Sequence, residues 1–438
     1  MKDFARWDNA SMKGKYTILA PQMSEIHFGL LESVIRGAGH DFKVIKEITA
    51  EDIKFGRDHV DSGMCYPTII TTGSLINTAI NLKNESGQPV KNVAIIMTQT
   101  GGSCRASQYV YTLRRVLRKL GREDIIVIPL AFAPFGKEPW NPLGFKLHDV
   151  KNAMCALLLG DLLMSLLHKT RPYEQAAGAS QAIVDQTLEQ FRVSGFKKMN
   201  DARFSSAVED ILAKFDQVKV SKQAKPKIGI VGEIYLKFNA SANNHLVRRI
   251  EDAGGEAVVT PLVDFFLYCF AGQVFQHELL GRSWLNSQVM KILINFVERR
   301  KTMVSRCMAN HECSQQIHWP DIFTLSKKVD DPLHPEKRII SRANNAGEGW
   351  LLPAEIVDLI EQGCNGVVIT QPFGCLANHA IGRGTEKKIR ELFPYVQITC
   401  LDYDPNVSSA NQDNRLELLF QFVKQLISIF TQRENINN

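Results

Sequence analysis

Val-Val-Ile-Thr-Gln-Pro-Phe-Gly-Cys-Leu-Ala-Asn-His, residues 367–379, is the stretch that decides the fold. Its first residues are apolar and β-branched, which is typical of a buried strand. The run stops at Pro372 and Gly374, two residue types that favour turns, and the turn presents Cys375. This stretch therefore predicts a buried strand that ends at a cysteine.

Similar runs recur along the chain and alternate with helical patterns. Strands are expected at 16–20, 42–45, 93–98 and 125–130, and again at 228–231, 257–260, 366–370 and 397–401. Helices are expected at 26–36, 108–120, 245–253, 353–362 and 386–393. Repeated βα alternation indicates parallel sheets with helices on both faces. We expect an α/β protein with two Rossmann or flavodoxin-like parallel-sheet domains that look like pseudo-equivalent halves.

Helical and polar stretches separate the two halves. From 144 to about 218 the pattern is helical throughout, and residues 221–227 are polar and precede a new strand. We expect a first α/β domain at 1–145, a helical linker or lid at 146–222, and a second α/β domain at 223–438. The second domain carries a helical insert at about 262–342.

Composition excludes several classes of protein. The 438 residues are 45% hydrophobic and carry a net charge of +6 without any block of like charge, which speaks against nucleic-acid binding. The most apolar segment, 154–167, contains Asp161 and is shorter than the roughly 20 residues of a membrane span, so it predicts a buried helix and no membrane. No signal peptide is visible, so a cytoplasmic location is expected. There, nine cysteines favour metal or redox chemistry over disulfides.

Cys65 and Cys104 occur in the same kind of setting as Cys375, next to glycines and at the start of an expected helix. All three thiols should lie at the carboxyl edges of the sheets, where ligands bind in open parallel folds. Helix amino termini also lower thiol pKa values, which favours metal ligation. Position alone leaves a second interpretation open, in which each cysteine is a small buried hydrophobe.

Three residues with charged or titratable side chains are expected near these thiols and could bind substrate or transfer protons. His379 follows Cys375 by four residues and could be a ligand, a proton donor or a capping residue. Arg105 and Arg383 flank the same expected crevice and could hold an anionic substrate group.

The remaining cysteines point elsewhere. Core packing is expected for Cys155, Cys269, Cys364 and Cys400. A second metal site with loose spacing is the alternative for a further set of residues, namely Cys307, His311, Cys313 and His318.

Several motifs occur in order along nearly the whole chain. They are Asp-Ser-Gly-Met-Cys-Tyr-Pro at 61–67, Thr-Gln-Thr-Gly-Gly-Ser-Cys-Arg at 98–105, Arg-Pro-Tyr-Glu at 171–174, Gly-Glu-Gly-Trp-Leu-Leu at 347–352, Gln-Pro-Phe-Gly-Cys with Asn-His at 371–379, and Asp-Tyr-Asp-Pro at 402–405. With these motifs the chain resembles the 2-hydroxyacyl-CoA dehydratase family, in particular a branch related to the carboxyl-terminal part of long activator-fused proteins. Ala377 stands where the family pattern leads us to expect proline.

The resemblance implies a cofactor and a partner. Cys65, Cys104 and Cys375 match the family's three cluster cysteines, which hold a 4Fe-4S cluster or, in double-cubane relatives, an 8Fe-9S cluster, here in the cleft between the two domains. Three thiolates leave one iron of a cube open to another ligand. In the family, an ATP-hydrolysing activator of the actin and Hsp70 type, which carries its own cluster, delivers a low-potential electron. The chain itself has no phosphate-binding Gly-x-x-x-x-Gly-Lys motif.

The leading hypothesis is an oxygen-sensitive iron-sulfur reductase or dehydratase component that acts on a small or CoA-thioester substrate, with His379 and Arg105 as candidate catalytic residues. One rival is a non-catalytic electron-transfer or scaffold subunit of a homodimer or heterodimer. The other is a structural zinc protein that uses the three cysteines and His379.

Overall fold

The fold is described from a computed structural model of the chain. It describes residues 4–99, 104–130, 141–196, 199–281, 283–311, 322–323, 338–406 and 409–437.

Two four-stranded sheets form the centre of the protein, and every strand pair in both is parallel. The first sheet contains β1 (Thr17–Pro21), β2 (Asp41–Ile45), β3 (Val93–Thr98) and β4 (Ile126–Leu130). The second contains β5 (Lys227–Gly232), β6 (Glu256–Val259), β7 (Gly366–Pro372) and β8 (Gln397–Tyr403). The strand orders β2-β1-β3-β4 and β6-β5-β7-β8 are equivalent. The α/β class and the two similar halves are therefore confirmed.

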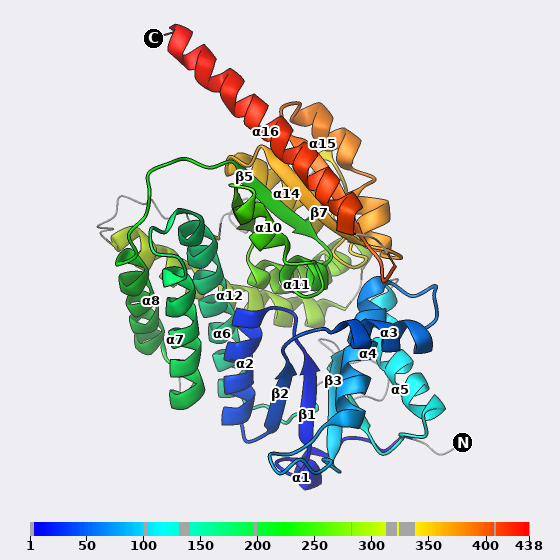
Figure 1. Cartoon of the computed structure of the whole chain (residues 1–438). Helices are drawn as coiled ribbons and strands as arrows, with labels where there is room; N and C mark the ends of the chain where they lie inside the picture. Colours follow the sequence, from blue (N-terminus) through cyan, green and yellow to red (C-terminus); the bar gives the residue numbers. More distant parts are fainter. Residues whose placement is uncertain are drawn as a thin grey trace.

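Helices cover both sheets. The first sheet is contacted by α2 (Glu25–Gly37), α4 (Tyr66–Asn81) and α5 (Tyr109–Lys119). The second is contacted by α9 (Ile234–Phe238), α10 (Leu246–Asp252), α14 (Leu351–Glu361) and α16 (Ser409–Asn437). The shorter elements are α1 (Asn9–Met12), α3 (Ala50–His59), α15 (Glu386–Leu392), the 3-10 turns η1 (Arg105–Gln108) and η2 (Arg171–Tyr173), and the π-helical turn η4 (Asn378–Gly382). In Figure 1 the two sheets lie one above the other.

A helical layer lies beside both sheets. It consists of α6 (Leu147–Thr170), α7 (Ala179–Ser194) and α8 (Asp201–Asp216), which stand side by side in Figure 1. The insert forms α11 (Leu262–Leu280) and α12 (Trp284–Asn310). Among the described residues, one helical stretch, Leu147–Tyr173, is long and apolar enough to cross a membrane, and 72% of its most apolar window is buried in the protein. It is the core helix that the sequence predicts, because it contacts α2, β6, α8 and α11.

A buried polar network joins the first half to α6 and to the insert. His27, on α2, places Nε2 2.9 Å from Asp161 Oδ1, and Ser24 Oγ lies 2.8 Å from His27 Nδ1. The Asp161 carboxylate also accepts hydrogen bonds from the amides of Leu262 and Val263, at 2.5 and 3.0 Å. It thereby satisfies the free N–H groups at the start of α11. One carboxylate therefore ties three helices together.

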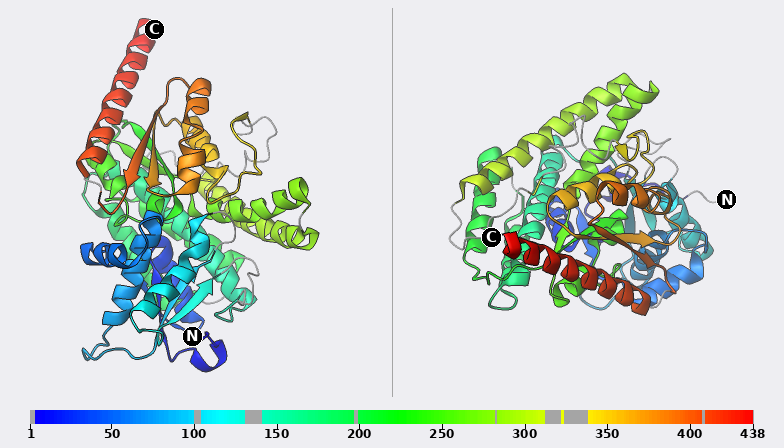
Figure 2. Two further views of the ribbon diagram at one scale, coloured as in Figure 1. Left: turned by 90° about the vertical axis from the view of Figure 1, so that its right-hand side faces the viewer. Right: turned by 90° about the horizontal axis from the view of Figure 1, so that it is seen from above.

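The expected elements agree closely with the observed ones. Each of the eight strands is found within two residues of its expected ends, because apolar runs buried in parallel sheets leave a strong sequence signal. The long helix α16 was not expected, and its second half extends away from the body in the left view of Figure 2. The domain limits at 145 and 222 stay predictions.

Candidate functional site

Cys65 lies at the start of α4, as its N-cap residue, and is 5% exposed. Its Sγ atom is 3.0 Å from Thr68 Oγ1, in the first turn of the helix, and 3.8 Å from Tyr109 Oη. Pro67 stands near the first helical position, where a missing N–H group costs nothing, so the sequence itself fixes where this helix begins. The thiol is thereby held at the edge of the first sheet.

Cys104 lies in the corresponding place before η1 and α5, again as an N-cap residue. Its Sγ accepts a hydrogen bond from the Ala106 amide at 3.5 Å. The glycines expected to help here, Gly101 and Gly102, lie outside the described residues.

Cys375 follows β7 and precedes the π-helical turn η4. The side chain is 5% exposed, and its Sγ accepts a hydrogen bond from Asn378 Nδ2 at 3.2 Å. Gly374 has φ +74°, a backbone conformation that favours glycine and lets the chain reverse before the cysteine. π-helical turns of this kind occur frequently at functional sites.

Hydrogen bonds to two main-chain carbonyls bring the three cysteine turns together. The Tyr66 amide donates to the Phe373 carbonyl at 3.1 Å, and the Arg105 guanidinium donates to the Gly374 carbonyl. A Cβ atom added to Gly374 would lie 3.2 Å from Cys65 Cα. The turn that carries Cys375 in the second half therefore packs against the turns of Cys65 and Cys104 in the first.

Gly347 packs against the turns of Cys104 and Cys375. A Cβ atom at Gly347 would lie 2.9 Å from Ala377 Cβ and 3.8 Å from Cys104 Sγ. Its φ of +60° also favours glycine. Within the described ranges, no group of three or more His, Cys, Asp or Glu side chains stands close enough to hold a single metal ion. A four-iron cube binds cysteines at separate corners, so its ligands need not meet that condition.

Two buried glutamates stand beside the thiols. Glu233 directly follows β5 and is 7% exposed, and Glu348 is 5% exposed. Burial, with the charge of Glu348 added, raises the pKa of Glu233 to about 8. The pKa of Glu348 is raised as well, chiefly by burial. Each accepts a backbone hydrogen bond at the start of α9, from Leu236 and Ile234 respectively.

Burial dominates the acidity of all three thiols. It raises the pKa of Cys104 to about 12 and also raises the pKa values of Cys65 and Cys375. The charge of Glu233 raises the pKa of each thiol further, which places this carboxylate near all of them. Backbone amides at the starts of these turns, those of Thr68, Ala106 and Asn378, do lower the three pKa values as expected. Desolvation of the thiolates outweighs them, so the net shift of each pKa is upward.

The two candidate catalytic residues, His379 and Arg105, lie at the protein surface. His379 is exposed, and its Nδ1 atom lies 3.0 Å from Gln371 Nε2, which also donates to Asp402 Oδ1 at 2.8 Å. Arg105 is exposed, and its hydrogen bond to Gly374 gives it a structural role between the halves. Neither residue has a contact with a cysteine thiol among those the structure shows.

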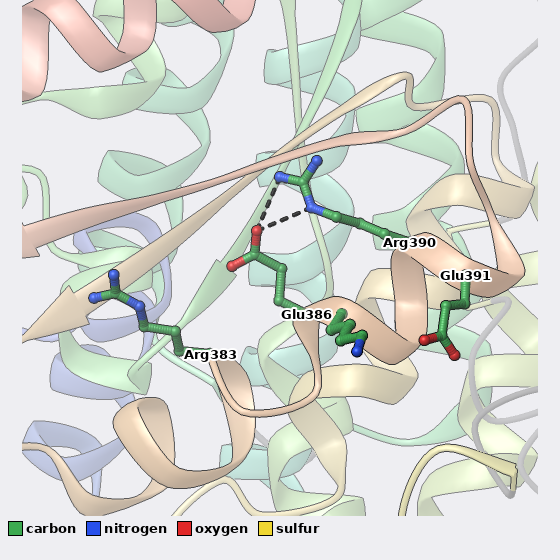
Figure 3. Close-up of a pocket in the computed structure, with 5 residues that line it drawn as sticks. Arg383, Glu386, Arg390 and Glu391 are labelled. Atoms are coloured by element: carbon green, nitrogen blue, oxygen red, sulfur yellow. Dashed lines mark hydrogen bonds and ion pairs between the residues drawn. The ribbon is translucent and has the colours of Figure 1, made fainter.

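Arg383 directly follows η4, the turn after Cys375, and its amide donates to the Asn378 carbonyl at 2.8 Å. It lines an open depression of about 490 Å³ with Glu386, Lys387, Arg390 and Glu391. In Figure 3 Glu386 is paired with Arg390, while the guanidinium of Arg383 points away from that pair. The sequence placed Arg383 and Arg105 in one crevice, whereas Arg383 lines a depression of which none of the three cysteines is part.

The other cysteines occupy varied positions. Cys155, Cys364 and Cys400 are buried and Cys269 is half-buried. Cys307 is half-buried on α12. His311 follows as the C-cap residue of α12, whereas Cys313 and His318, the other members of the expected second site, lie outside the described residues.

The Arg-Pro-Tyr-Glu motif holds the helical layer to the second half. Arg171 makes two hydrogen bonds to the buried carboxylate of Glu251, at 2.7 and 2.8 Å. Tyr173 Oη donates to Glu256 at 2.6 Å, and Glu174 accepts hydrogen bonds near the start of α7. The structure therefore gives this motif a structural role, away from the cysteines.

No protein-family model matches the chain, and no curated protein matches it. The fold and the site define a class, an α/β protein in which three cysteine turns are in contact where its two parallel-sheet halves meet.

The roles of Glu233 and Glu348, and of Thr68 and Asn378 beside the cysteine sulfurs, were not predicted from the sequence. Glu233 had a readable signal, because an acidic residue directly after a buried strand lies at the carboxyl edge of the sheet. Thr68 and Asn378 each follow a cysteine by three residues, which is the reach of an N-cap partner.

The raised pKa of Glu233 predicts a pH-dependent stability. Between pH 4.5, its ordinary pKa, and about pH 8, the folded protein holds a proton on Glu233 that the unfolded chain has lost. The stability that this proton contributes is therefore fully present below pH 4.5 and is lost as pH rises through about 8. In urea unfolding of the metal-free protein, Glu233→Gln should lose less stability than wild type between about pH 5 and about pH 8. The exposed Glu85→Gln should behave as wild type. A wild-type-like pH profile for Glu233→Gln would contradict the assignment.

Proposed function

We propose that this protein is an iron-sulfur reductase or dehydratase component that receives low-potential electrons from a separate ATP-hydrolysing activator. The observation that carries the proposal is the contact between three cysteine turns from the two halves, in which Cys65 and Cys375 are buried and Cys104 is half-buried. The resemblance to 2-hydroxyacyl-CoA dehydratases supports the same assignment, with a small or CoA-thioester substrate and a cytoplasmic location.

The residues present fit a cluster. Cys65, Cys104 and Cys375 would be its thiolate ligands, because their donor chemistry suits iron and each sulfur has a hydrogen-bond partner. Gly347 and Gly374 leave room where a Cβ atom would crowd the cysteine turns. Three thiolates would leave one iron of a 4Fe-4S cube for substrate, water or the bridging sulfide of a double-cubane cluster. A bound cluster would supply one-electron chemistry at that position.

The chain's own residues would contribute to the chemistry of the site in several ways. The low exposure of Cys65 and Cys375 would limit the access of water to these two sulfurs, and the fixed turns hold the three thiols in place. With a pKa raised to about 8, Glu233 holds a proton at neutral pH that it could transfer within the site. His379 and Arg105, both exposed, stand where a substrate or a partner would approach.

Metal analysis tests the assignment. After strictly anaerobic purification, the protein should contain iron and acid-labile sulfide, as a cluster requires. Zinc without sulfide would instead support the structural zinc alternative, in which His379 is the fourth ligand.

The electron source is tested by EPR spectroscopy. Dithionite alone should reduce the cluster poorly, whereas the cognate activator with ATP and Mg²⁺ should reduce it well. Because docking of charged surfaces weakens with salt, activator-dependent reduction should fall as ionic strength rises. Equal reduction with and without activator would remove the ATP-driven partner. Turnover in the complete mixture would separate an enzyme from a scaffold subunit, and sedimentation would separate homodimer from heterodimer.

A further inference from the structure

Each of the three thiols has a hydrogen-bonding neighbour, and two of these neighbours are side chains at the same offset. Thr68 follows Cys65 by three residues and lies 3.0 Å from its sulfur. Asn378 follows Cys375 by three residues and donates to its sulfur at 3.2 Å. Both side chains are fully buried. The two halves therefore repeat one device, a cysteine at a turn with its donor one helical turn further on.

Ligation fixes the direction of these hydrogen bonds. A thiolate bound to iron carries no hydrogen, so the Thr68 hydroxyl and the Asn378 amide must both donate to sulfur. The amide oxygen of Asn378, Oδ1, is buried without a hydrogen-bond partner in the described part of the chain. A purely structural asparagine would use both ends of its amide. Its donor end is directed at Cys375 instead.

We infer that Thr68 and Asn378 are positioning residues that set the reduction potential of the iron-sulfur group held by Cys65 and Cys375. The inference rests on the proposed function. Hydrogen bonds to ligating sulfurs stabilise the more negative, reduced state and so raise the potential. The two residues would make the group easier to reduce by the one electron that the activator delivers.

The first experiment compares two buried threonines of α4. Thr68→Val removes the hydroxyl beside Cys65, whereas Thr71→Val removes a hydroxyl that donates to the Pro67 carbonyl. In a redox titration followed by EPR, Thr68→Val should shift the midpoint potential to a more negative value at unchanged iron content. Thr71→Val should leave the potential unchanged, and Thr68→Ser, which keeps the hydroxyl, should restore it.

The second experiment uses Asn378→Leu, which removes the amide but keeps a similar volume. It should also lower the midpoint potential, and the double variant should add the two shifts. Variants with full iron content and wild-type potentials would overturn the inference while leaving the proposed function intact. A wild-type protein without iron and sulfide would overturn both.

Discussion

Replacing Cys65, Cys104 or Cys375 with alanine, one at a time, should remove most of the iron from the anaerobically purified protein. Each substitution takes away one of three thiolate anchors, and none of the other cysteines that the structure describes lies in these three turns. The effect should be similar for the three variants, because the thiols come from both halves and no pair within one half suffices. Iron and sulfide content per chain is the measurement.

Cys155→Ala is the matched control for these variants. Its thiol is fully buried on α6, within the largest core cluster. It should cost some stability through lost packing, yet leave iron content unchanged. Full iron retention in the Cys104→Ala protein would exclude that residue as a ligand and would contradict the shared site.

Strands and cysteine turns could be predicted from the sequence because their signals are local. The run before Cys375 begins with three apolar β-branched residues, and Pro67, two residues after Cys65, marks the start of a helix. The contacts between halves could not be predicted. The hydrogen bond from the Tyr66 amide to the Phe373 carbonyl joins residues far apart in sequence and uses only main-chain atoms, which no residue type announces.

Electrostatic properties were also beyond local reasoning. A cysteine at a helix amino terminus is expected to be acidic, but the pKa of Cys104 is raised to about 12 because the fold buries it. Likewise, Glu233 and Glu348 become a buried pair only when the start of α9 meets the turn before α14. The sign of such shifts depends on how much water the whole fold removes.

The same dependence on distant packing makes Asp161 the residue whose loss should destabilise the fold most among those considered. It sits within an apolar helix, and the sequence offers it no partner nearby. In the fold it is completely buried and accepts hydrogen bonds from Leu262 and Val263. Because an ionised carboxylate only accepts, His27 Nε2 carries the proton between the two side chains.

Asp161→Ala should lower the free energy of unfolding by about 3–5 kcal/mol, because it leaves His27 and two helix-end amides buried without their partner. Urea unfolding measures the loss. Asp161→Asn keeps an acceptor for the amides and should cost less. Asp185→Ala, at an exposed site on α7, is the control and should stay within about 0.5 kcal/mol of wild type. If Asp161→Ala unfolded at the wild-type urea concentration, the carboxylate would not join α2, α6 and α11.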